Sequence, residues 1–488
     1  MIVSLLCRTW VIFYGLCTHG INAILQVNLL KFTVHHIFIE SASVPNSHFK
    51  THIDRLRNLY QEALEHSRQL GESVNAVLIH SGSQQYYYAD DQEIAFRAFG
   101  HFLHWLPVNR ADQFVFIQAD KRPIYFQLVP DDFWYDQSIN IDTEVSEQFS
   151  VIRINQLDSL LKYLPDNSDI AFLGESLDIA KLLKINSSAI NPKHLLHFLN
   201  FHRAIKSEYE IEQLRVANAT ALIGHKAARH CFLNNGNELD IHRSYLSACN
   251  IIETQSPYTN IVALDEKSAI LHYQHKRNSA IKNSQVLLID AGFAQANYCS
   301  DITRTWVRGH CHEVFKSLVE QMHILELELV NAVVPGMAYP QLHALALEKI
   351  AGLLISHDIC NSSQESLLAN HIPQLFMPHG VGHLLGLQVH DVGGRQQNIN
   401  GDELSAPTHS PALRNTRTLC KDMVFTVEPG LYFIPLLLDP HRNTKLGQCI
   451  NFSLVDSLIP CGGIRIEDNI RVTDTGAENL TRQFESYA

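Results

Sequence analysis

The sequence predicts two folded domains, the first of which belongs to the α/β class. The chain of 488 residues is long enough for two or three domains of ~150 residues each. Residues 48–70 and 207–232 carry apolar side chains three and four positions apart among charged ones, which is the pattern of an amphipathic helix. The alternating apolar and polar segments between these helices predict strands at 76–80, 114–118 and 124–128 and a helix at 154–163.

The second long helix marks the expected start of the second domain. It opens with Glu208 and Glu210, at the helix end where the dipole favours negative charge. The sequence has no Pro-rich linker and no repeat of solenoid period, so two ordinary domains are sufficient. We therefore predict an N-terminal extension of residues 1–45, a domain of residues 46–203 and a domain of residues 204–488.

The composition limits the classes of function. Lys and Arg total 38 against 50 Asp and Glu, and the resulting net charge of −12 disfavours duplex nucleic acid as a partner. The ten cysteines are scattered without a CxxC pair, which is typical of reduced thiols in a cytoplasmic protein. Histidine is unusually frequent, at 28 residues, and several histidines lie in Gly-rich or acidic segments where imidazole can bind a metal.

The first forty residues differ in composition from the rest of the chain. Between Met1 and Ile39, only Arg8 and Lys31 carry a full charge. A transmembrane anchor needs roughly 20 predominantly apolar residues, and polar residues such as Asn22 interrupt this stretch. A signal peptide is a second option, but no small-residue cleavage site follows the apolar run. We favour an extension that precedes the first domain, and we expect no stable membrane partner.

Two aspartates flank the centre of the segment VLLIDAGFAQANYCSDITRTW, residues 286–306. The β-rich runs on either side of a Gly-containing centre predict a hairpin. With its turn between Gln295 and Ala296, Asp290 would lie opposite Asp301, with Cβ atoms about 4.5 to 5.5 Å apart. Two carboxylates this close repel each other unless a proton or a cation lies between them. The segment therefore predicts either a divalent-cation site or two turn-forming aspartates that face each other by coincidence.

Three histidines, His379, His383 and His390, lie in the Gly-rich segment FMPHGVGHLLGLQVHDVGG, residues 376–394. A lone histidine is most often a hydrogen-bonded structural residue. Glycines permit close backbone approach and unusual dihedral angles, so these histidines need not follow helical spacing. Packing alone does not require three imidazoles here. We expect one to bind a metal and two to act as hydrogen-bond donors in catalysis.

Two glutamates, Glu428 and Glu467, lie in strand-like apolar segments, MVFTVEPGLYF and GGIRIEDNI. A lone charge there would be costly to bury without a partner. In the second segment, Arg465, Glu467 and Asn469 share one face by the period of two. Each segment is also compatible with a solvated edge strand whose glutamate forms a salt bridge. Their occurrence beside two aspartates and a histidine cluster favours a shared site.

The resulting set, Asp290, Asp301, His383, Glu428 and Glu467, contains four carboxylates and one imidazole. This hard, oxygen-rich set suits manganese and similar ions. Its four negative charges balance two divalent cations. A pair of ions ~3.5 to 4 Å apart can share a bridging water, lower the pKa of that water and polarise a carbonyl.

In their order along the chain, these motifs resemble those of the pita-bread metallopeptidases, and specifically the bacterial Xaa-Pro dipeptidases (prolidases). The resemblance runs from about Phe49 to the C-terminus and includes SPYTNIVALDE at 256–266, AILHYQ at 269–274 and GGIRIEDN at 462–469. It implies a creatinase-like α/β N-terminal domain and an α+β pita-bread catalytic domain. It also implies two divalent ions, Mn²⁺ in the first place with Co²⁺ or Zn²⁺ as alternatives, and a homodimer.

The resemblance also assigns metal ligands. Asp290 would bind one ion, Asp301 and Glu467 would bridge both ions, and His383 and Glu428 would complete the coordination of the other.

Further positions match the substrate pocket of the family. Arg465 and Tyr258 correspond to residues that shape this pocket, and Tyr339 is a weaker match. In the family, a residue from the N-terminal domain of the neighbouring subunit closes the pocket. Asp90 and Trp134 are the candidates for that residue in this chain.

The activity implied by the resemblance is hydrolysis of dipeptides with proline in second position, which releases free proline. A metal-activated hydroxide would attack the scissile carbonyl, while His390 stabilises the oxyanion and His379 orients the substrate. Glu428 would pass a proton to the proline nitrogen, near which His272 would lie. The alternatives are an Xaa-Pro aminopeptidase acting on longer peptides, phosphotriester hydrolysis as a side activity, and a non-catalytic binding protein. The complete ligand set argues against the last.

Overall fold

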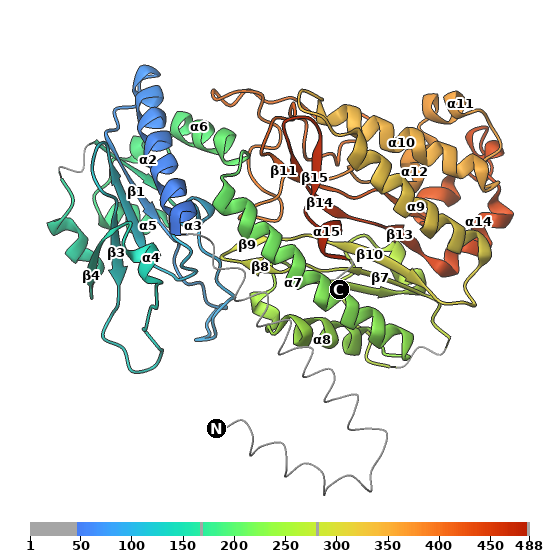
Figure 1. Ribbon diagram of the computed structural model, residues 1–488, viewed down its shortest axis with the longest axis horizontal. Helices are drawn as coiled ribbons and strands as arrows, with labels where there is room; N and C mark the ends of the chain where they lie inside the picture. Colours follow the sequence, from blue (N-terminus) through green and yellow to red (C-terminus); the bar gives the residue numbers. More distant parts are fainter. Residues whose placement is uncertain (1–45, 166–168, 280–282, 486–488) are drawn as a thin grey trace, which may run out of the picture. The chain divides into compact units, whose positions relative to one another are not determined.

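The computed structural model describes residues 46–165, 169–279 and 283–485 (Figure 1). The proposed extension of residues 1–45, with its alternatives of an anchor or a signal peptide, lies outside the described residues. Within the described ranges, no helix combines the length and the apolar content needed to cross a membrane.

The N-terminal part is built on a five-stranded mixed sheet in the order β4-β3-β2-β1-β5. Its two antiparallel pairings are β1 with β2 and β2 with β3, and its two parallel pairings are β1 with β5 and β3 with β4. The strands are β1 (Ala76–His80), β2 (Phe114–Gln118), β3 (Ile124–Leu128), β4 (Ser150–Ile154) and β5 (Ile170–Leu173). The helices are α2 (Asn46–Gln69), α3 (Gly100–Trp105), α4 (Thr143–Ser146), α5 (Leu177–Leu182) and α6 (Lys193–Arg203).

Helix α2 confirms the amphipathic pattern of its sequence. The side chains that it buries recur every three or four residues, at Phe49, Ile53, Leu56, Tyr60 and Ala63. The helix packs against α6 and β2, and it lies in front of the sheet in Figure 1. The strands predicted at 76–80, 114–118 and 124–128 are also confirmed.

The helix predicted at 154–163 is wrong. Residues Ser150–Ile154 form β4, and only a 3₁₀ helix, Leu157–Lys162, follows. The β-branched residues Val151 and Ile152 favour a strand beside β3. Pro165 limits the segment at its other end. Between these two limits, the chain forms only the 3₁₀ helix.

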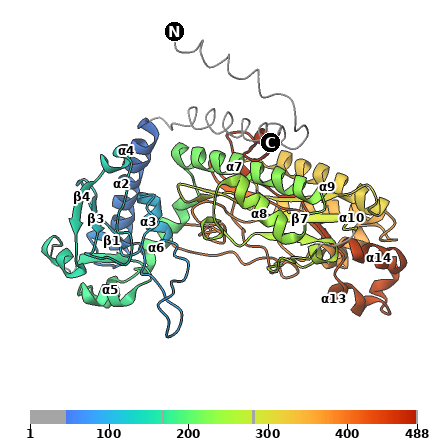
Figure 2. The same ribbon diagram turned by 90° about the horizontal axis from the view of Figure 1, so that it is seen from below.

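The C-terminal part opens with α7, whose start is fixed by a capping box. The Ser207 side chain accepts the Glu210 backbone N–H, and the Glu210 carboxylate accepts the Ser207 N–H. Helices α7 and α8 pack side by side, as do α9 and α10 (Figure 1). Figure 2 shows α7 and α9 on the same side of strand β7. The helices of this part are α7 (Glu208–Leu233), α8 (Glu238–Cys249), α9 (Glu313–Ala332), α10 (Tyr339–Ser356), α11 (Gln364–Ala369), α12 (Ile372–Phe376), α13 (Pro435–Leu438), α14 (Phe452–Leu458) and α15 (Arg482–Glu485).

The strands of this part form small antiparallel sheets, β10-β7-β6, β11-β14-β15, β12-β13 and β8-β9. A single backbone bridge between Thr303 and Glu467 links the first of these sheets to the segment between β13 and β14. The strands are β6 (Ile261–Leu264), β7 (Val286–Asp290), β8 (Ala294–Gln295), β9 (Tyr298–Cys299), β10 (Thr303–Val307), β11 (Val424–Val427), β12 (Gly430–Tyr432), β13 (Gly463–Arg465), β14 (Asp468–Val472) and β15 (Ala477–Asn479).

The hairpin of residues 286–306 forms, but its predicted register is wrong. Its turn residues are Ala296 and Asn297, with φ of 46° and 71°. A two-residue hairpin turn with positive φ at both positions favours Asn at one of them. Because Asn297 meets this preference, the turn lies one residue further along the chain than predicted. Asp290 therefore faces Thr303, two residues away from the predicted partner Asp301. A shift of two residues keeps the same face of the strand, so both carboxylates still reach one site.

Two buried histidines in the N-terminal part make the stability sensitive to acid. Burial lowers the pKa of His52 to about 4 and that of His101 to about 3. Both values lie below that of an unfolded histidine, ~6.5, so the unfolded chain binds more protons as the pH falls. Their stabilising effect is complete above pH ~6.5 and is lost as the pH falls toward the folded values.

We expect the free energy of unfolding to fall by roughly 2 kcal/mol for each of these histidines between pH 7 and pH 5. Urea denaturation at both pH values, followed by circular dichroism, measures this loss. His101→Gln should lose less stability on acidification than the wild type, whereas His409→Gln, at an exposed position, should lose as much. An equal loss in all three proteins would contradict the assignment to buried histidines.

Candidate metal centre

The five predicted ligands come from separate elements that converge at one side of the hairpin. Asp290 ends β7, Asp301 precedes β10, His383 lies in the loop after α12, Glu428 follows β11, and Glu467 lies between β13 and β14. Ligand atoms of Asp301, His383 and Glu467 all lie within 4.8 Å of one another. Oε1 of Glu428 lies 3.7 Å from Nε2 of His383.

Asp290 joins the group through two neighbours. Nη2 of Arg465 donates to Oδ2 of Asp290 at 2.6 Å. Thr303, which faces Asp290 across the strands, donates its hydroxyl to Glu467 at 2.6 Å and accepts Nε–H of Arg465. The structure thus brings all five residues of the set into one cluster, in which Asp290 and Glu428 are partly buried and the other three are buried.

The ring of His383 is oriented as a ligand. Nδ1 lies 3.0 Å from the carbonyl oxygen of Leu384, which can only accept, so Nδ1 carries the proton. The lone pair of Nε2 then faces Oδ2 of Asp301 at 3.4 Å and Oε1 of Glu428 at 3.7 Å. A backbone carbonyl that fixes the tautomer in this way is a common partner of metal-binding histidine.

The carboxylates of the cluster call for a cation. Burial, together with the charge of Asp301, raises the pKa of Asp290 to about 6 despite the opposing effect of Arg465. Burial and like charges also raise the pKa of Glu428 to about 7 and that of Glu467 well above its usual range. Oδ1 of Asp290 is buried and has no hydrogen-bond partner. Acidic groups forced together, with one oxygen unpaired, fit the two divalent ions expected from the sequence.

Asp301 is held by two neighbours outside the ligand set. Asn469 binds the Asp301 backbone, since its Oδ1 accepts the Asp301 N–H at 3.0 Å. The hydroxyl of Tyr258 donates to Oδ1 of Asp301 at 2.5 Å. Burial raises the pKa of Tyr258 well above its usual range, so this hydroxyl stays a donor. Arg465, Glu467 and Asn469 therefore all act on the same side, as their spacing predicted.

We expect Tyr258→Phe to weaken divalent-cation affinity by roughly 10- to 100-fold, because Asp301 loses the donor that orients it. Isothermal titration with Mn²⁺ measures the change. Tyr163→Phe, which removes a hydroxyl from an exposed tyrosine, serves as the matched control. An unchanged affinity in Tyr258→Phe would contradict the role of this hydroxyl.

His379 forms one end of a hydrogen-bond chain beside the cluster. Its Nδ1 donates to the carbonyl of Gly380 at 2.7 Å, and its Nε2 accepts the hydroxyl of Tyr432 at 3.0 Å. Arg465 in turn donates to the Tyr432 oxygen at 3.0 Å. Burial and the charge of Arg465 lower the pKa of His379 to about 3, so its ring is neutral. The sequence pattern did not indicate Tyr432.

His390 and His272 are both exposed to solvent, and both lie near the cluster. The ring centroid of His390 is 4.4 Å from that of His383, at an interplanar angle of 88°. Burial and the nearby His383 lower the pKa of His390 to about 4. The charge of His272 also lowers the pKa of both His379 and His390, so His272 lies close to both rings.

A buried ion group anchors the loop of His390. Asp391 accepts hydrogen bonds from Arg203 and from Lys206, the latter at 2.8 Å, and all three side chains are almost fully buried. Arg203 ends α6 and Lys206 precedes α7, so both cations come from the connection between the two predicted domains. The positive charges of the Arg203 guanidinium and the Lys206 ammonium lower the pKa of Asp391 to about 2, although burial acts in the opposite direction.

A cavity of about 430 Å³ opens next to the cluster. Its lining includes His383 and His390, together with Arg395, Glu403 and Arg414. Arg414 is a functional candidate that sequence reasoning missed, because it lies in an irregular segment where spacing gives no periodic signal. Its cationic side chain lies close enough to His390 to lower the pKa of that ring.

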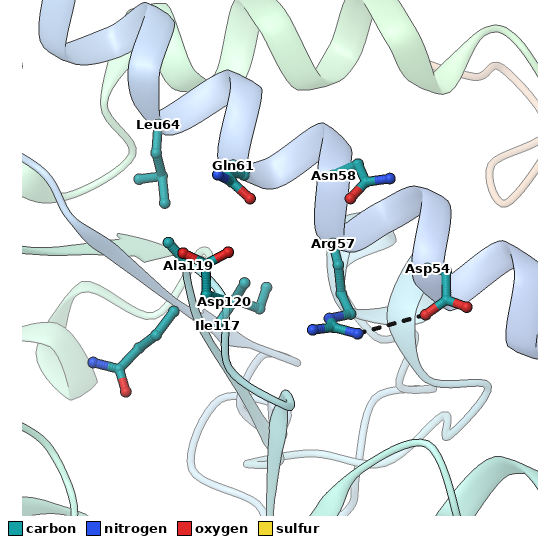
Figure 3. A pocket seen from close by; sticks show the side chains of 9 residues that line it. Asp54, Arg57, Asn58, Gln61, Leu64, Ile117, Ala119 and Asp120 are labelled. Carbon is teal, nitrogen blue, oxygen red and sulfur yellow. Dashed lines mark ion pairs between the residues drawn. The ribbon is translucent and has the colours of Figure 1, made fainter.

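A second hollow, of about 290 Å³, lies between α2 and the end of β2 (Figure 3). Its charged side chains are Asp54, Arg57 and Asp120, and Arg57 pairs with Asp54 at 3.5 Å. None of the predicted site residues lines it.

Three predicted pocket residues do not contact the cluster. Tyr339 is fully buried and donates its hydroxyl to the carbonyl of Thr426 at 2.8 Å, behind the loop of His383. Asp90 and Trp134 lie on exposed loops of the N-terminal part, and Trp134 is 77% exposed. Among the described residues, neither of them has a contact with the acidic cluster.

Comparison with known proteins agrees with this architecture. Residues 212–474 match the metallopeptidase family M24, and residues 47–201 match the N-terminal domain of Xaa-Pro dipeptidase. An Xaa-Pro dipeptidase of Pseudoalteromonas atlantica is 39% identical over 440 residues, which cover 89% of this chain and 98% of the relative. An Xaa-Pro dipeptidase of Shewanella baltica is 38% identical over 90% of this chain and 98% of its own length.

Solved structures with the same fold include a variant of Escherichia coli aminopeptidase P, with a TM-score of 0.66 and 21% identity, covering 88% of this chain and 97% of that one. Proline aminopeptidase P II from Yersinia pestis has a TM-score of 0.64 at 21% identity, covering 88% and 96% of the two chains. These structures support the combination of an α/β N-terminal domain with an α+β pita-bread domain. The sequence matches establish that the chain belongs to metallopeptidase family M24 and, within it, to the bacterial Xaa-Pro dipeptidases.

Proposed function

We propose that the acidic cluster is the active site at which the protein hydrolyses Xaa-Pro dipeptides and releases free proline. The observation that carries the proposal is the convergence of four carboxylates and one imidazole from five separate segments. The Xaa-Pro dipeptidases that share 38 to 39% identity with nearly the whole chain support the choice of substrate.

The cluster fits two divalent ions. Asp290 would hold one of them, Asp301 and Glu467 would bridge both, and His383 and Glu428 would hold the other. We favour Mn²⁺, since carboxylates outnumber the single imidazole, with Co²⁺ and Zn²⁺ as the alternatives. Bound there, the ions supply a water of lowered pKa and polarise the scissile carbonyl.

The residues of the chain provide the proton transfers. The carboxylate of Glu428 accepts the proton of the attacking water and delivers it to the proline nitrogen as the amide bond breaks. A group with a pKa near neutrality is suited to both steps, and burial already raises the pKa of Glu428 to about 7. His390 is neutral and borders the cavity, so it can donate to the oxyanion that develops on the carbonyl.

Other groups recognise the substrate. The amide that precedes proline has no N–H, so the site cannot depend on a donor at that position. Arg414 lines the cavity beside His390, where its guanidinium can bind the carboxylate of the proline. Arg465 and His379 also border the cluster, through Asp290 and Glu428 respectively, and His272 would approach the leaving group from its exposed segment. A carboxylate-binding arginine near the metal centre favours substrates of two residues.

A proline-release assay on Ala-Pro and Ala-Pro-Ala, combined with metal analysis of the purified protein, tests the proposal. We expect rapid hydrolysis of Ala-Pro that depends on a divalent ion, with little cleavage of Ala-Pro-Ala. Efficient cleavage of the tripeptide would instead identify an Xaa-Pro aminopeptidase. Hydrolysis of a phosphotriester faster than that of Ala-Pro would overturn the assignment of the main substrate, and no hydrolysis of any of them would indicate a binding protein.

We further propose that the protein acts as a homodimer. Six aromatic side chains are exposed at residues 86–88 and 133–135, and Tyr86 lies close enough to Tyr135 for an electrostatic interaction. Exposed aromatic groups of this kind are enriched at protein interfaces. A second copy that covers them would bring Asp90 and Trp134 of one subunit toward the pocket of the other, as the family pattern implies.

We expect Trp134→Ser to weaken dimerisation by roughly tenfold or more, because the change removes a large interface aromatic group. Sedimentation velocity across a range of concentrations measures the effect. Leu436→Ser, at a side chain that is 82% exposed on α13, is the matched control. A wild-type protein that sediments as a monomer at every concentration would contradict the dimer.

The cysteine pattern supports a reducing compartment, and we propose the cytoplasm as the location. The eight cysteines among the described residues are all free. Fractionation of the source cells, followed by immunodetection of the protein, tests this location.

A further inference from the structure

Two cysteines far apart in the sequence meet in the core of the catalytic domain. Sγ of Cys311 lies 4.0 Å from Sγ of Cys461, and 150 positions separate the two residues in the chain. The residues are 2% and 1% exposed, respectively. An S–S bond needs the two sulfur atoms at about 2.05 Å, so a closure of about 2 Å would join them.

The backbone on the Cys461 side is tightly fixed. The hydroxyl of Ser268 donates to the carbonyl of Asp265 at 2.7 Å, lies 3.2 Å from the carbonyl oxygen of Cys461 and accepts the N–H of Gly463 at 2.8 Å. Gly462 has φ of +84°, and a Cβ there would meet the carbonyl oxygen of Asp265 at 2.2 Å. Cys461 is therefore held immediately before β13, the strand that leads to Arg465 and Glu467.

The Cys311 side lies just beneath the surface. Cys311 directly precedes His312, the N-cap of the 20-residue helix α9. Gly309 and His310 before it are exposed, so a small solute reaches the pair through a local movement of this turn. Cys461 is therefore held by a fixed backbone, whereas Cys311 lies in a turn that can adjust its position.

The two thiols differ in acidity. The S–H of Cys311 and the backbone N–H of His312 stabilise the thiolate of Cys461, which lowers the pKa of Cys461 below its usual range. The same contact and burial raise the pKa of Cys311. A thiolate is the reactive form of cysteine, so Cys461 is the expected nucleophile and Cys311 the resolving thiol.

We propose that Cys311 and Cys461 form a reversible disulfide when the protein meets hydrogen peroxide. The Cys461 thiolate attacks one peroxide oxygen, the O–O bond breaks, and a sulfenic acid and hydroxide result. The sulfur of Cys311 then attacks the sulfenic sulfur, an S–S bond forms, and the S–O bond breaks with release of water once the thiol proton has been transferred. Overall, two thiols lose two electrons and the peroxide is reduced to two waters. A dithiol reductant reverses the oxidation.

The disulfide would connect the start of α9 to the start of β13. A cross-link between residues this far apart in the chain restricts the unfolded state strongly, so it stabilises the folded protein. The sulfur atoms already lie close together in the folded state, and β13 is held by Ser268. The positions of Arg465 and Glu467 therefore change little, and the enzyme remains active. This inference is independent of the proposed substrate.

Peptide mass spectrometry of the folded full-length protein, with and without hydrogen peroxide, tests the proposal. We expect a cross-linked pair of peptides containing Cys311 and Cys461, lighter by two hydrogens than the reduced pair, that disappears after reduction. The melting temperature should rise by several degrees on oxidation. The value of kcat should change by less than about twofold, because a disulfide away from the reacting atoms leaves the activation free energy of hydrolysis unchanged.

Cys311→Ser and Cys461→Ser should each abolish both the cross-linked pair and the rise in melting temperature. Cys249→Ser, which alters another buried thiol, should retain both. If either variant fails to fold, the wild-type peptide map alone decides the question. The proposal is overturned if peroxide leaves both thiols reduced, oxidises them to sulfinic acids, or links either of them to a different cysteine.

Discussion

Asp301→Ala is expected to lose both divalent ions and to reduce kcat/KM by roughly 10³-fold or more, equivalent to about 4 kcal/mol of transition-state stabilisation. Asp301 lies at the centre of the cluster, where its carboxylate contacts His383 at 3.4 Å and accepts the hydroxyl of Tyr258. Asp301 is one of the two proposed bridges between the ions, so its removal would leave Glu467 as the only carboxylate shared by both. Metal content by mass spectrometry and the rate of proline release measure the two losses independently.

The Asp301 experiment needs a variant that separates loss of the ions from loss of the fold. Asp301→Asn keeps the shape of the side chain and should give nearly the same losses. Asp240→Ala, at an exposed position on α8, should keep both metal and activity. Full activity of the metal-depleted Asp301→Ala protein would refute the proposed centre.

Glu428→Gln is expected to reduce kcat by roughly 10²- to 10⁴-fold at saturating metal, the range associated with loss of a general acid–base group. The amide oxygen of glutamine can still face His383, but it cannot accept a proton and release it again. KM should change much less than kcat, since the proposed carboxylate-binding side chain, Arg414, is unchanged. Steady-state kinetics with Ala-Pro at saturating Mn²⁺ separates the two constants.

The matched control for this second variant is Glu313→Gln, at an exposed glutamate in the first turn of α9. It should leave kcat within experimental error of the wild type. A Glu428→Gln enzyme with kcat close to wild type would assign the proton transfer to another group. Metal content must be measured in the same samples, so that a lower occupancy is not mistaken for a slower step.

Sequence reasoning succeeded where a local pattern has one structural solution. The strands at 76–80, 114–118 and 124–128 are short apolar runs rich in β-branched and aromatic residues, and their sheet buries nearly all of these residues. It failed where the structure depends on the position of a turn or on the strand with which a segment pairs. The segment 154–163 could not be resolved without knowing that Ile154 pairs with β3.

The hairpin register failed because the turn was placed by symmetry and not by backbone chemistry. Asn297 tolerates positive φ and offered the signal that would have corrected it. The approach of Asp290 and Asp301 survived the error because a shift of two residues does not change the face of the strand. Thr303, which occupies the predicted place of Asp301, now donates to Glu467.

For the residues of the site, the type of residue was more informative than its spacing along the chain. Carboxylates and histidines in apolar or Gly-rich segments stand out, because burying such a group requires a partner. Tyr432 and Arg414 do not stand out, since an aromatic residue in a strand and an arginine in a loop are common everywhere. Their relevance arises only from the His379 ring and the cavity wall to which they belong.

The buried group of Arg203, Lys206 and Asp391 bears on attempts to isolate the catalytic half. A protein starting at residue 204 would lack the guanidinium that binds Asp391, and the helix that supplies it, α6, would be missing as well. The buried carboxylate of Asp391 would remain with only Lys206 to balance it, immediately beside His390. Such a truncated enzyme should be inactive even if every metal ligand is present, so the first domain is a structural component of the catalyst.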